Sequence, residues 1–86
     1  MTAVQKSHVP TRIIKRYLAA YMSKYPDMTL QELAWRADIP DRRLWAIMYE
    51  EQESVQFNTA DKILLNLGYQ MAWYEDPELE QYWLAA

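Results

Sequence analysis

The residue types that could do chemistry in this chain are few, because the sequence has no cysteine and only one histidine. Without cysteine there is no disulfide and no thiolate nucleophile. The single histidine, His8, falls in an aperiodic segment near the N-terminus, where no partner would be positioned for acid–base work. Glu50, Glu51 and Glu53 could in principle hold a divalent cation, but acids at one helix end usually form a solvated face. We therefore expect no enzyme activity, no cofactor, no metal site and no small-molecule substrate.

Recognition of nucleic acid is the other chemistry available, and its candidate residues lie between positions 41 and 45. Arg42 is suited to a bidentate contact with guanine, whereas Arg43, turned further round a helix, would more naturally reach a phosphate. Asp41 could accept a hydrogen bond from a cytosine amine or hold Arg42 in place. Trp45 could press against a thymine methyl or a sugar, or it could pack against the first helix or a partner chain. For both arginines, ordinary surface charge is the alternative.

These side chains need a helix to present them, and residues 29–50 predict two. Thr29 followed by Glu32 indicates a capping box, which begins a helix. Apolar residues then recur at spacings of three and four, at Leu30, Leu33, Ala34 and Ala37. Asp38 tolerates the left-handed backbone that ends a helix, and Pro40 fits only the first turn of another. The second helix would turn an apolar stripe inward, formed by Leu44, Ile47 and Met48. Two short helices joined by a tight turn, with a small residue at their crossing, are typical of a helix-turn-helix.

This segment resembles the DNA-binding domains of repressor and Cro type (XRE-like) found in phages and bacteria. The resemblance rests on a short pattern of residues, namely Thr29, Leu30, Leu33, Ala34, Ile39 and Leu44. Residues 57–64, 73–79 and Tyr82 are also similar to small helix-turn-helix proteins of phages that infect actinobacteria. Two departures stand out: Asp38 replaces the family's usual glycine in the turn, and no glycine follows the second helix. The resemblance implies a lambda repressor-like fold, a recognition helix in the major groove, and transcriptional regulation in a bacterial cytoplasm.

The remaining pattern predicts an all-α, compact bundle of about five short helices without strands, formed by one domain spanning residues 1–86. Residues 1–10 would be a flexible arm and residues 11–24 the first helix. The third helix would extend to about residue 51. Asn58 would cap a fourth helix that ends at Gly68, and Asp76 before Pro77 would open a fifth within an acidic, aromatic C-terminal segment, residues 69–86.

The net charge of −3 is unevenly distributed, and this limits where DNA could bind. Residues 1–50 hold eight Lys or Arg and five Asp or Glu, whereas residues 51–86 hold one Lys and seven acids. Only the first half can therefore present a positive face to phosphates. Besides Arg43, the expected contacts to the DNA backbone are helix-terminal residues and cations, namely Thr29, Gln31, Arg36, Asn58 and Arg16.

Residues 69–86 carry five aromatic residues among four acids, which is more than a one-sided surface helix needs. Part of this set should close the monomer's core, and the remainder would form a partner surface. We expect a homodimer that uses Trp73, Tyr82 and Trp83. The alternative to DNA binding is a protein-interaction module whose acidic aromatic tail binds another regulator or an RNA polymerase part. No apolar run approaches eighteen residues, so no membrane span is expected.

Overall fold

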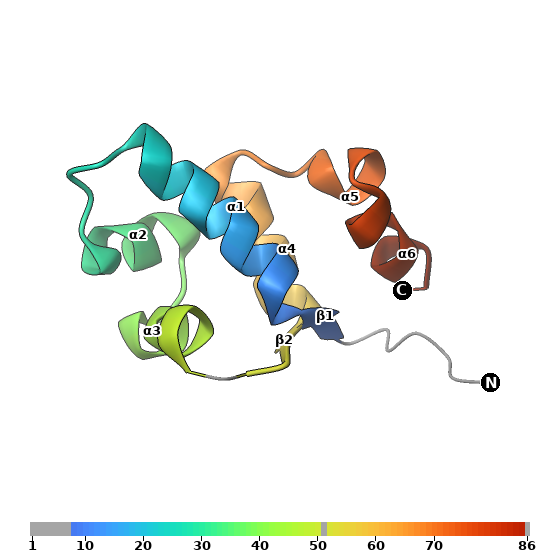
Figure 1. Cartoon of the computed structure of the whole chain (residues 1–86), viewed down its shortest axis with the longest axis horizontal. Helices are drawn as coiled ribbons and strands as arrows, with labels where there is room; N and C mark the ends of the chain where they lie inside the picture. The colour runs from blue at the N-terminus through green and yellow to red at the C-terminus, as the bar shows by residue number, and fades with distance from the viewer. Residues whose placement is uncertain (1–7, 51, 86) are drawn as a thin grey trace.

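The computed structural model describes residues 8–50 and 52–85 of the chain. In this part the chain is mostly helical and includes one short two-stranded sheet (Figure 1). The elements in chain order are β1 (His8–Pro10), α1 (Thr11–Lys24), α2 (Leu30–Ala37), α3 (Asp41–Tyr49), β2 (Ser54–Gln56), α4 (Phe57–Leu67), α5 (Ala72–Glu75) and α6 (Pro77–Ala85). The predicted helical character is confirmed. The prediction of about five helices without strands is wrong in that the described residues form six helices and two short strands.

The two strands are the main difference from the expected all-α fold. β1 pairs with β2 in antiparallel register, with Val9 opposite Val55, and both valines are buried. The backbone amide of Thr11 continues this connection by donating to the carbonyl of Glu53 at 3.0 Å. The prediction of a flexible arm is therefore wrong for His8–Pro10, because pairing with a distant segment orders them. Residues 1–7 of that arm lie outside the described residues.

The core lies between α1 and α4, and α2, α3 and the sheet close one side of it (Figure 1). One continuous cluster of buried side chains joins all these elements. The apolar spacing of α1 places Ile13, Ile14 and Leu18 in this cluster, where each is fully buried. α4 contributes its own stripe of Ala60, Ile63, Leu64 and Leu67.

The segment from Thr29 to α3 follows the local signals closely. The Thr29 hydroxyl accepts a hydrogen bond from the Glu32 amide at 3.1 Å and begins α2. Asp38 ends α2 in a left-handed conformation, with φ of 60° and ψ of 45°. Pro40 lies at the N-cap position in an extended conformation, one residue before the first turn in which it was expected, and makes no side-chain cap bond. The last helical residue of α3 is Tyr49, two residues earlier than expected. Ala34 is fully buried, and its carbonyl accepts from the Ile39 amide at 3.0 Å, which fixes the turn.

The C-terminal segment is two helices rather than one. α5 ends before Asp76, and α6 begins at Pro77, because a proline cannot donate the amide that would continue the earlier helix. The Asp76 carboxylate accepts from the amide of Glu78 at 3.0 Å, so the predicted start signal is confirmed. α4, by contrast, begins one residue before Asn58, and Asn58 is not its cap. Gly68 ends α4 with φ of 87°, as expected.

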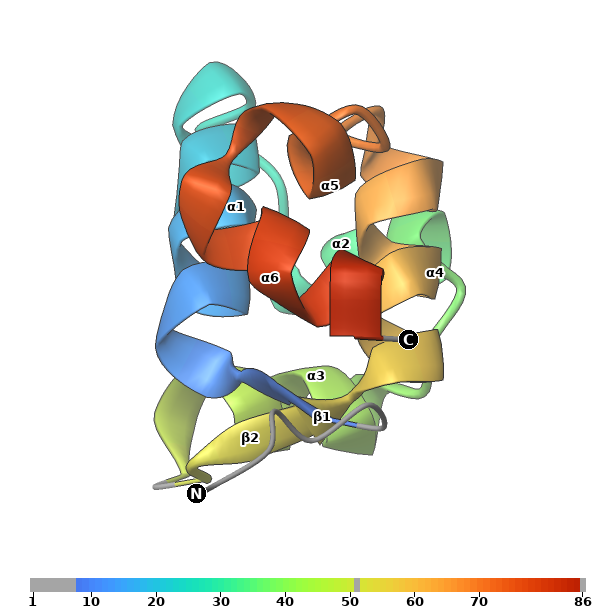
Figure 2. The same ribbon diagram turned by 90° about the vertical axis from the view of Figure 1, so that its right-hand side faces the viewer.

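α5 and α6 lie across α1 and α4, at the opposite end of the molecule from α2 and most of α3 (Figures 1 and 2). They are held there by a stack of rings: Phe57 lies 4.7 Å from Trp73 between centroids, and Trp73 lies 6.5 Å from Trp83. Among the described residues, no helix combines the length and apolar character that crossing a membrane requires. The acidic tail and the α2–α3 pair thus occupy different ends of the protein.

Candidate nucleic-acid interface

The outward face of α3 is formed by the residues opposite its buried stripe. Leu44 and Ile47 are buried, which turns Arg42 and Trp45 toward solvent. Tyr49 stands one turn beyond Trp45, and their ring centroids are 5.3 Å apart. Trp45 is 53% exposed and Tyr49 57% exposed. Asp41 is exposed at the beginning of the same helix. The residues predicted to contact bases, Asp41, Arg42 and Trp45, are thus all accessible on one short helix.

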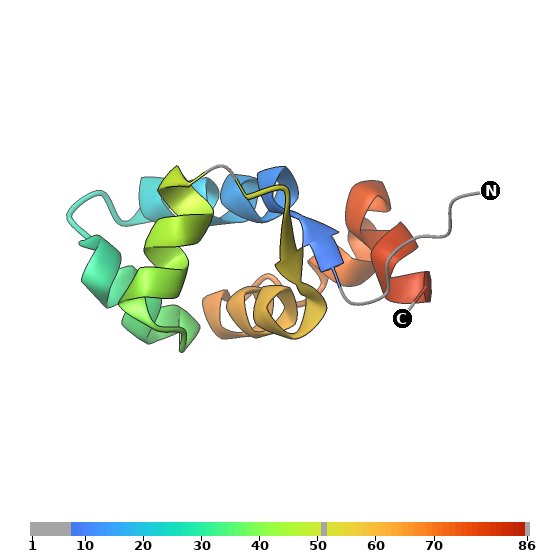
Figure 3. The same cartoon turned by 90° about the horizontal axis from the view of Figure 1, so that it is seen from below.

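A groove of about 770 Å³ separates α3 from β2, and both elements lie along the lower face of the molecule (Figure 3). Arg42 and Arg43 line it from α3, and Ser54 and Gln56 line it from β2. Glu50 and Glu53 also line it, so the groove carries both signs of charge. Arg43 therefore lies on the side of α3 that faces the strand.

A smaller cavity of about 270 Å³ brings together Arg43 and Asn58, two residues predicted to contact the DNA backbone. Lys62 from α4 lines the same cavity and was not predicted. Its ammonium lies 3.8 Å from the Asp38 carboxylate, and both side chains are largely exposed. Such a pair contributes little to stability and leaves the lysine accessible to a competing anion. Arg43, Asn58 and Lys62 thus bring three side chains with hydrogen-bond donor groups to one cavity.

The residues predicted at α2 are partly occupied by contacts within the protein. Gln31 is exposed, whereas the Thr29 hydroxyl already serves as the helix cap. Arg36 donates to the Tyr21 hydroxyl at 3.0 Å and to the Glu32 carboxylate at 3.1 Å. The hydrogen bond to Tyr21, and then that to Glu32, raise the pKa of Arg36 despite some desolvation. Arg36 therefore ties α2 to α1, and a contact to DNA would have to compete with these bonds.

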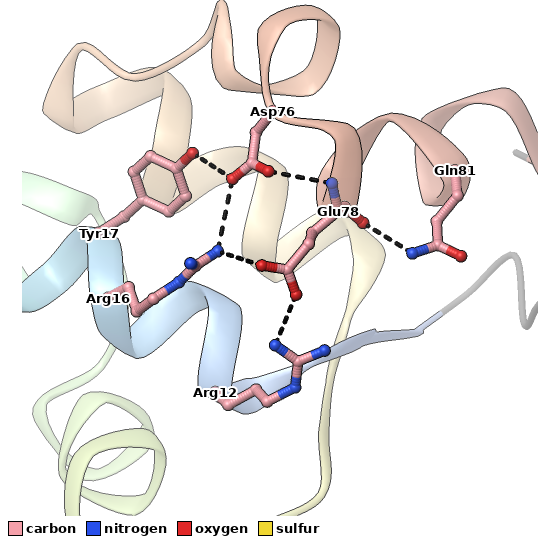
Figure 4. A network of polar contacts seen from close by, with 6 residues as sticks. All are labelled: Arg12, Arg16, Tyr17, Asp76, Glu78 and Gln81. Carbon is pink, nitrogen blue, oxygen red and sulfur yellow. Dashed lines mark hydrogen bonds and ion pairs between the residues drawn. The ribbon is translucent and has the colours of Figure 1, made fainter.

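Arg16 is placed differently from its predicted role, as Figure 4 shows. Its guanidinium lies 3.0 Å from the Glu78 carboxylate and 3.5 Å from that of Asp76. Arg12 donates to Glu78 at 2.6 Å, and the Tyr17 hydroxyl donates to Asp76 at 2.6 Å. The charge of Arg16 is thus matched by the acids at the beginning of α6. This position does not support the predicted contact of Arg16 with DNA.

The same network shifts the titration of its members. The hydrogen bond from Tyr17 is the largest cause that lowers the pKa of Asp76, and the bond from Arg12 is the largest that lowers the pKa of Glu78. Burial, followed by the bond to Asp76, raises the pKa of Tyr17 from 10.0 to about 12. All three shifts favour the protonation states in which the tail stays bound to α1 near neutral pH.

The three residues predicted at a partner interface differ in accessibility. Trp73 is 1% exposed, and its indole nitrogen donates to the Asp61 carboxylate at 2.9 Å. It is therefore a core residue, and its assignment to a partner surface is wrong for this structure. Tyr82 is half-buried against the core, and Trp83 is 38% exposed. Trp73 is buried because its large ring fills the space between α4 and α6, where it contacts Phe57 and Trp83.

Three accessible residues, one each on α2, α3 and α4, were missed by the sequence analysis. Tyr49 could have been found, because it follows Trp45 by four residues and must share its side of a helix. Trp35, 80% exposed on α2, could have been found from the positions of Leu33 and Ala34 in the same way. Lys62 gave no such signal, since its proximity to Arg43 arises from the packing of α4.

No group of three His, Asp or Glu side chains in the described ranges is arranged to hold a metal ion. Comparison of the chain with models of protein families, with curated proteins and with solved structures finds no match.

Proposed function

We propose that the protein is a sequence-specific regulator of transcription that binds double-stranded DNA, of the repressor and Cro type. In this proposal α2 and α3 form a helix-turn-helix, and α3 enters the major groove as the recognition helix. The protein performs no chemistry and acts by occupying an operator. We further propose that it comes from a phage or mobile element and acts in the cytoplasm of a bacterial host.

The turn between α2 and α3 supports this assignment. Asp38 stands where the resembled family usually has glycine, and it adopts the left-handed conformation that glycine adopts most easily. Asp is among the residues that tolerate this conformation. The apparent departure from the family pattern is thus a substitution that keeps the same backbone. The second departure is the lack of a glycine after α3, where the chain continues into β2.

The observation that carries the proposal is the outward face of α3. Arg42 is presented from the first turn, where a recognition helix reads base edges, and Trp45 follows one turn later. Arg43 and Lys62 stand beside this face and are accessible to the adjoining phosphates. Arg42 and Trp45 would provide specificity for the base sequence. The position of the protein along the duplex would be fixed by phosphate contacts from Arg43, Asn58 and Lys62, and from Thr29 and Gln31 at the beginning of α2.

The placement of the acids is consistent with this use of α3. The tail carries most of the negative charge of the second half of the chain, and it lies at the other end of the molecule (Figure 1). Asp76 and Glu78 are in addition neutralised by Arg12 and Arg16. Repulsion between the tail and DNA would therefore be weaker than the sequence charge suggests.

A single copy would bind weakly, because Asp41, Glu50 and Glu53 lie close to the few cations of the interface. Helix-turn-helix proteins commonly increase their affinity for DNA by forming a two-fold dimer that spans two half-sites one helical turn apart. We propose such a homodimer through α6, with Trp83 as its main anchor and Tyr82 beside it. Trp73 takes no part in this interface, since it is buried in the monomer.

The test is selection of bound sites from random duplexes, followed by mobility shift at low salt with the selected site. Arg42→Ala should weaken binding to that site by about 1–3 kcal/mol and relax preference at one base pair, with a smaller effect on random duplex. Arg43→Ala and Lys62→Ala should weaken binding to all duplexes alike and reduce the salt dependence. Lys15→Ala, which removes an exposed cation from α1, is the matched control.

Equal losses on selected and random DNA for Arg42→Ala would contradict its role in reading a base. Failure to bind any duplex at low salt would contradict the proposal as a whole. That outcome would favour the protein-interaction module, in which the exposed Tyr74 and Trp83 among tail acids bind another regulator or a polymerase subunit.

A further inference from the structure

The recognition face of α3 is unusually aromatic for a surface that is proposed to meet polar base edges. Trp45 and Tyr49 stand on successive turns, and each keeps more than half of its surface exposed. Their rings lie 5.3 Å apart at an interplanar angle of 53°, which is within the range of aromatic pair contacts. The two side chains thus form one apolar surface on the solvent-facing side of the helix.

More than half of the surface of each ring residue faces solvent in the described part of the chain. The buried positions of α3 are Leu44 and Ile47, on the opposite side, and the ring contact that Trp45 and Tyr49 make is with each other. The cations Arg42 and Arg43 border the surface on the side of the groove toward β2. An occupant of this face must therefore combine negative charge at its border with apolar groups at its centre.

Double-stranded DNA offers one apolar group in the major groove, the 5-methyl of thymine. We infer, on the basis of the proposed function, that the operator carries thymines where Trp45 and Tyr49 meet it, beside the guanine contacted by Arg42. Trp45 and Tyr49 are separated by about 6 Å along the helix axis, at about 1.5 Å per residue. With about 3.4 Å between successive bases on a strand, the thymines lie within about two base steps of each other.

The test removes the methyl groups without altering the protein. Each thymine in the selected site is replaced in turn by uracil, which keeps every hydrogen-bonding group of the base and loses only the methyl. Wild-type protein should lose about three- to fivefold in affinity at the one or two thymines that meet the aromatic pair, and should lose nothing at the others.

Protein variants then assign the methyl contact to its residue. Trp45→Ala should bind the thymine and uracil duplexes equally at the position that Trp45 contacts, which closes a double-mutant cycle. Tyr49→Phe keeps the ring and should retain the full preference for thymine, whereas Tyr49→Ala should lose it at the neighbouring position. Arg43→Ala is the matched control, because it should weaken both duplexes equally and preserve the preference.

The outcomes separate this inference from the proposed function. Binding to a selected duplex that is indifferent to every replacement by uracil would overturn the thymine inference and leave the DNA-binding proposal intact. Tighter binding to single-stranded oligonucleotides than to the duplex would also overturn it, since the rings would then stack on unpaired bases. Absence of binding to any duplex would overturn both.

Discussion

The Tyr17 hydroxyl donates a hydrogen bond of 2.6 Å to the Asp76 carboxylate and so joins the middle of α1 to the beginning of α6 (Figure 4). Asp76 also accepts from the Glu78 amide, so the same carboxylate caps α6 and fixes the tail to α1. Arg12 and Arg16 surround this pair with positive charge. The contact explains how a tail rich in acidic residues packs against a helix that carries basic residues.

The first prediction is that Tyr17 makes stability sensitive to alkaline pH. Its pKa is raised from 10.0 to about 12, so the folded protein holds the phenolic proton more tightly than the unfolded chain. The resulting stabilisation is fully present below about pH 10 and is lost as pH rises through about 12. Urea unfolding at several alkaline pH values should show this decline, and Tyr17→Phe should flatten it. A Tyr17 that titrates with the ordinary tyrosines in an ultraviolet titration would contradict the prediction.

The second prediction concerns Asp76 at acid pH. Its pKa is lowered from 3.8, chiefly by the hydrogen bond from Tyr17, so the folded state favours the carboxylate. The stabilisation is present above pH 3.8 and is lost as pH falls through the lower folded value. Asp76→Asn should lower the free energy of unfolding near neutral pH and reduce its acid dependence. Glu75→Gln, at an exposed neighbouring acid, is the control and should change neither quantity.

The third prediction tests the backbone of the α2–α3 turn. Asp38 has φ of 60°, a conformation that costs ordinary L-residues about 1–2 kcal/mol. Asp38→Gly should keep or slightly raise the melting temperature, because the lost pairing with Lys62 is exposed and weak. Asp38→Val should lower stability by about 1–2 kcal/mol. Equal stability of the glycine and valine variants would mean that this conformation is not maintained in solution.

The fourth prediction concerns packing at Ala34. This residue is fully buried beside the turn, and extra methylenes there must displace neighbours. Ala34→Leu should therefore cost roughly 1–3 kcal/mol by thermal or denaturant unfolding. Ala20→Leu introduces the same side chain at an exposed position of α1, and its effect should remain within about 0.5 kcal/mol. A result in which both variants are equally stable would place Ala34 outside the core.

The fifth prediction separates the roles of two tail tryptophans. Trp73→Phe removes the hydrogen bond to Asp61 and leaves part of its buried space unfilled, which should cost about 1–3 kcal/mol of stability without weakening self-association. Trp83→Ala should weaken the proposed dimer, as measured by sedimentation at micromolar concentration, and it also removes the ring contacts of Trp83 with Phe57 and Trp73 within the monomer. A wild type that sediments as a 10.3 kDa monomer, or a Trp83→Ala variant that dimerises equally well, would remove α6 as the interface.

Local sequence signals predicted some parts of the candidate site correctly and one part wrongly. Thr29, Asp38 and Pro40 set the bounds of α2 and the beginning of α3, because each acts on backbone groups within a few residues of itself. The spacing of Leu44 and Ile47 then determined that Arg42 and Trp45 would be exposed. Asn58 was misjudged as a cap, since the helix that contains it begins at Phe57 with no side-chain cap.

What the sequence by itself determined is therefore the order of the main helices, the turn between α2 and α3, and the outward face of α3. Only the tertiary structure decided that Val9 pairs with Val55, that Trp73 is core, and that Arg16 faces the tail acids. It also decided that Lys62 joins Arg43 at one cavity. Helix limits and helix faces follow from interactions between residues that are neighbours in the chain. Strand pairing, burial of a large ring and ion pairs between helices depend on which distant surfaces meet, and that is settled when the whole core packs.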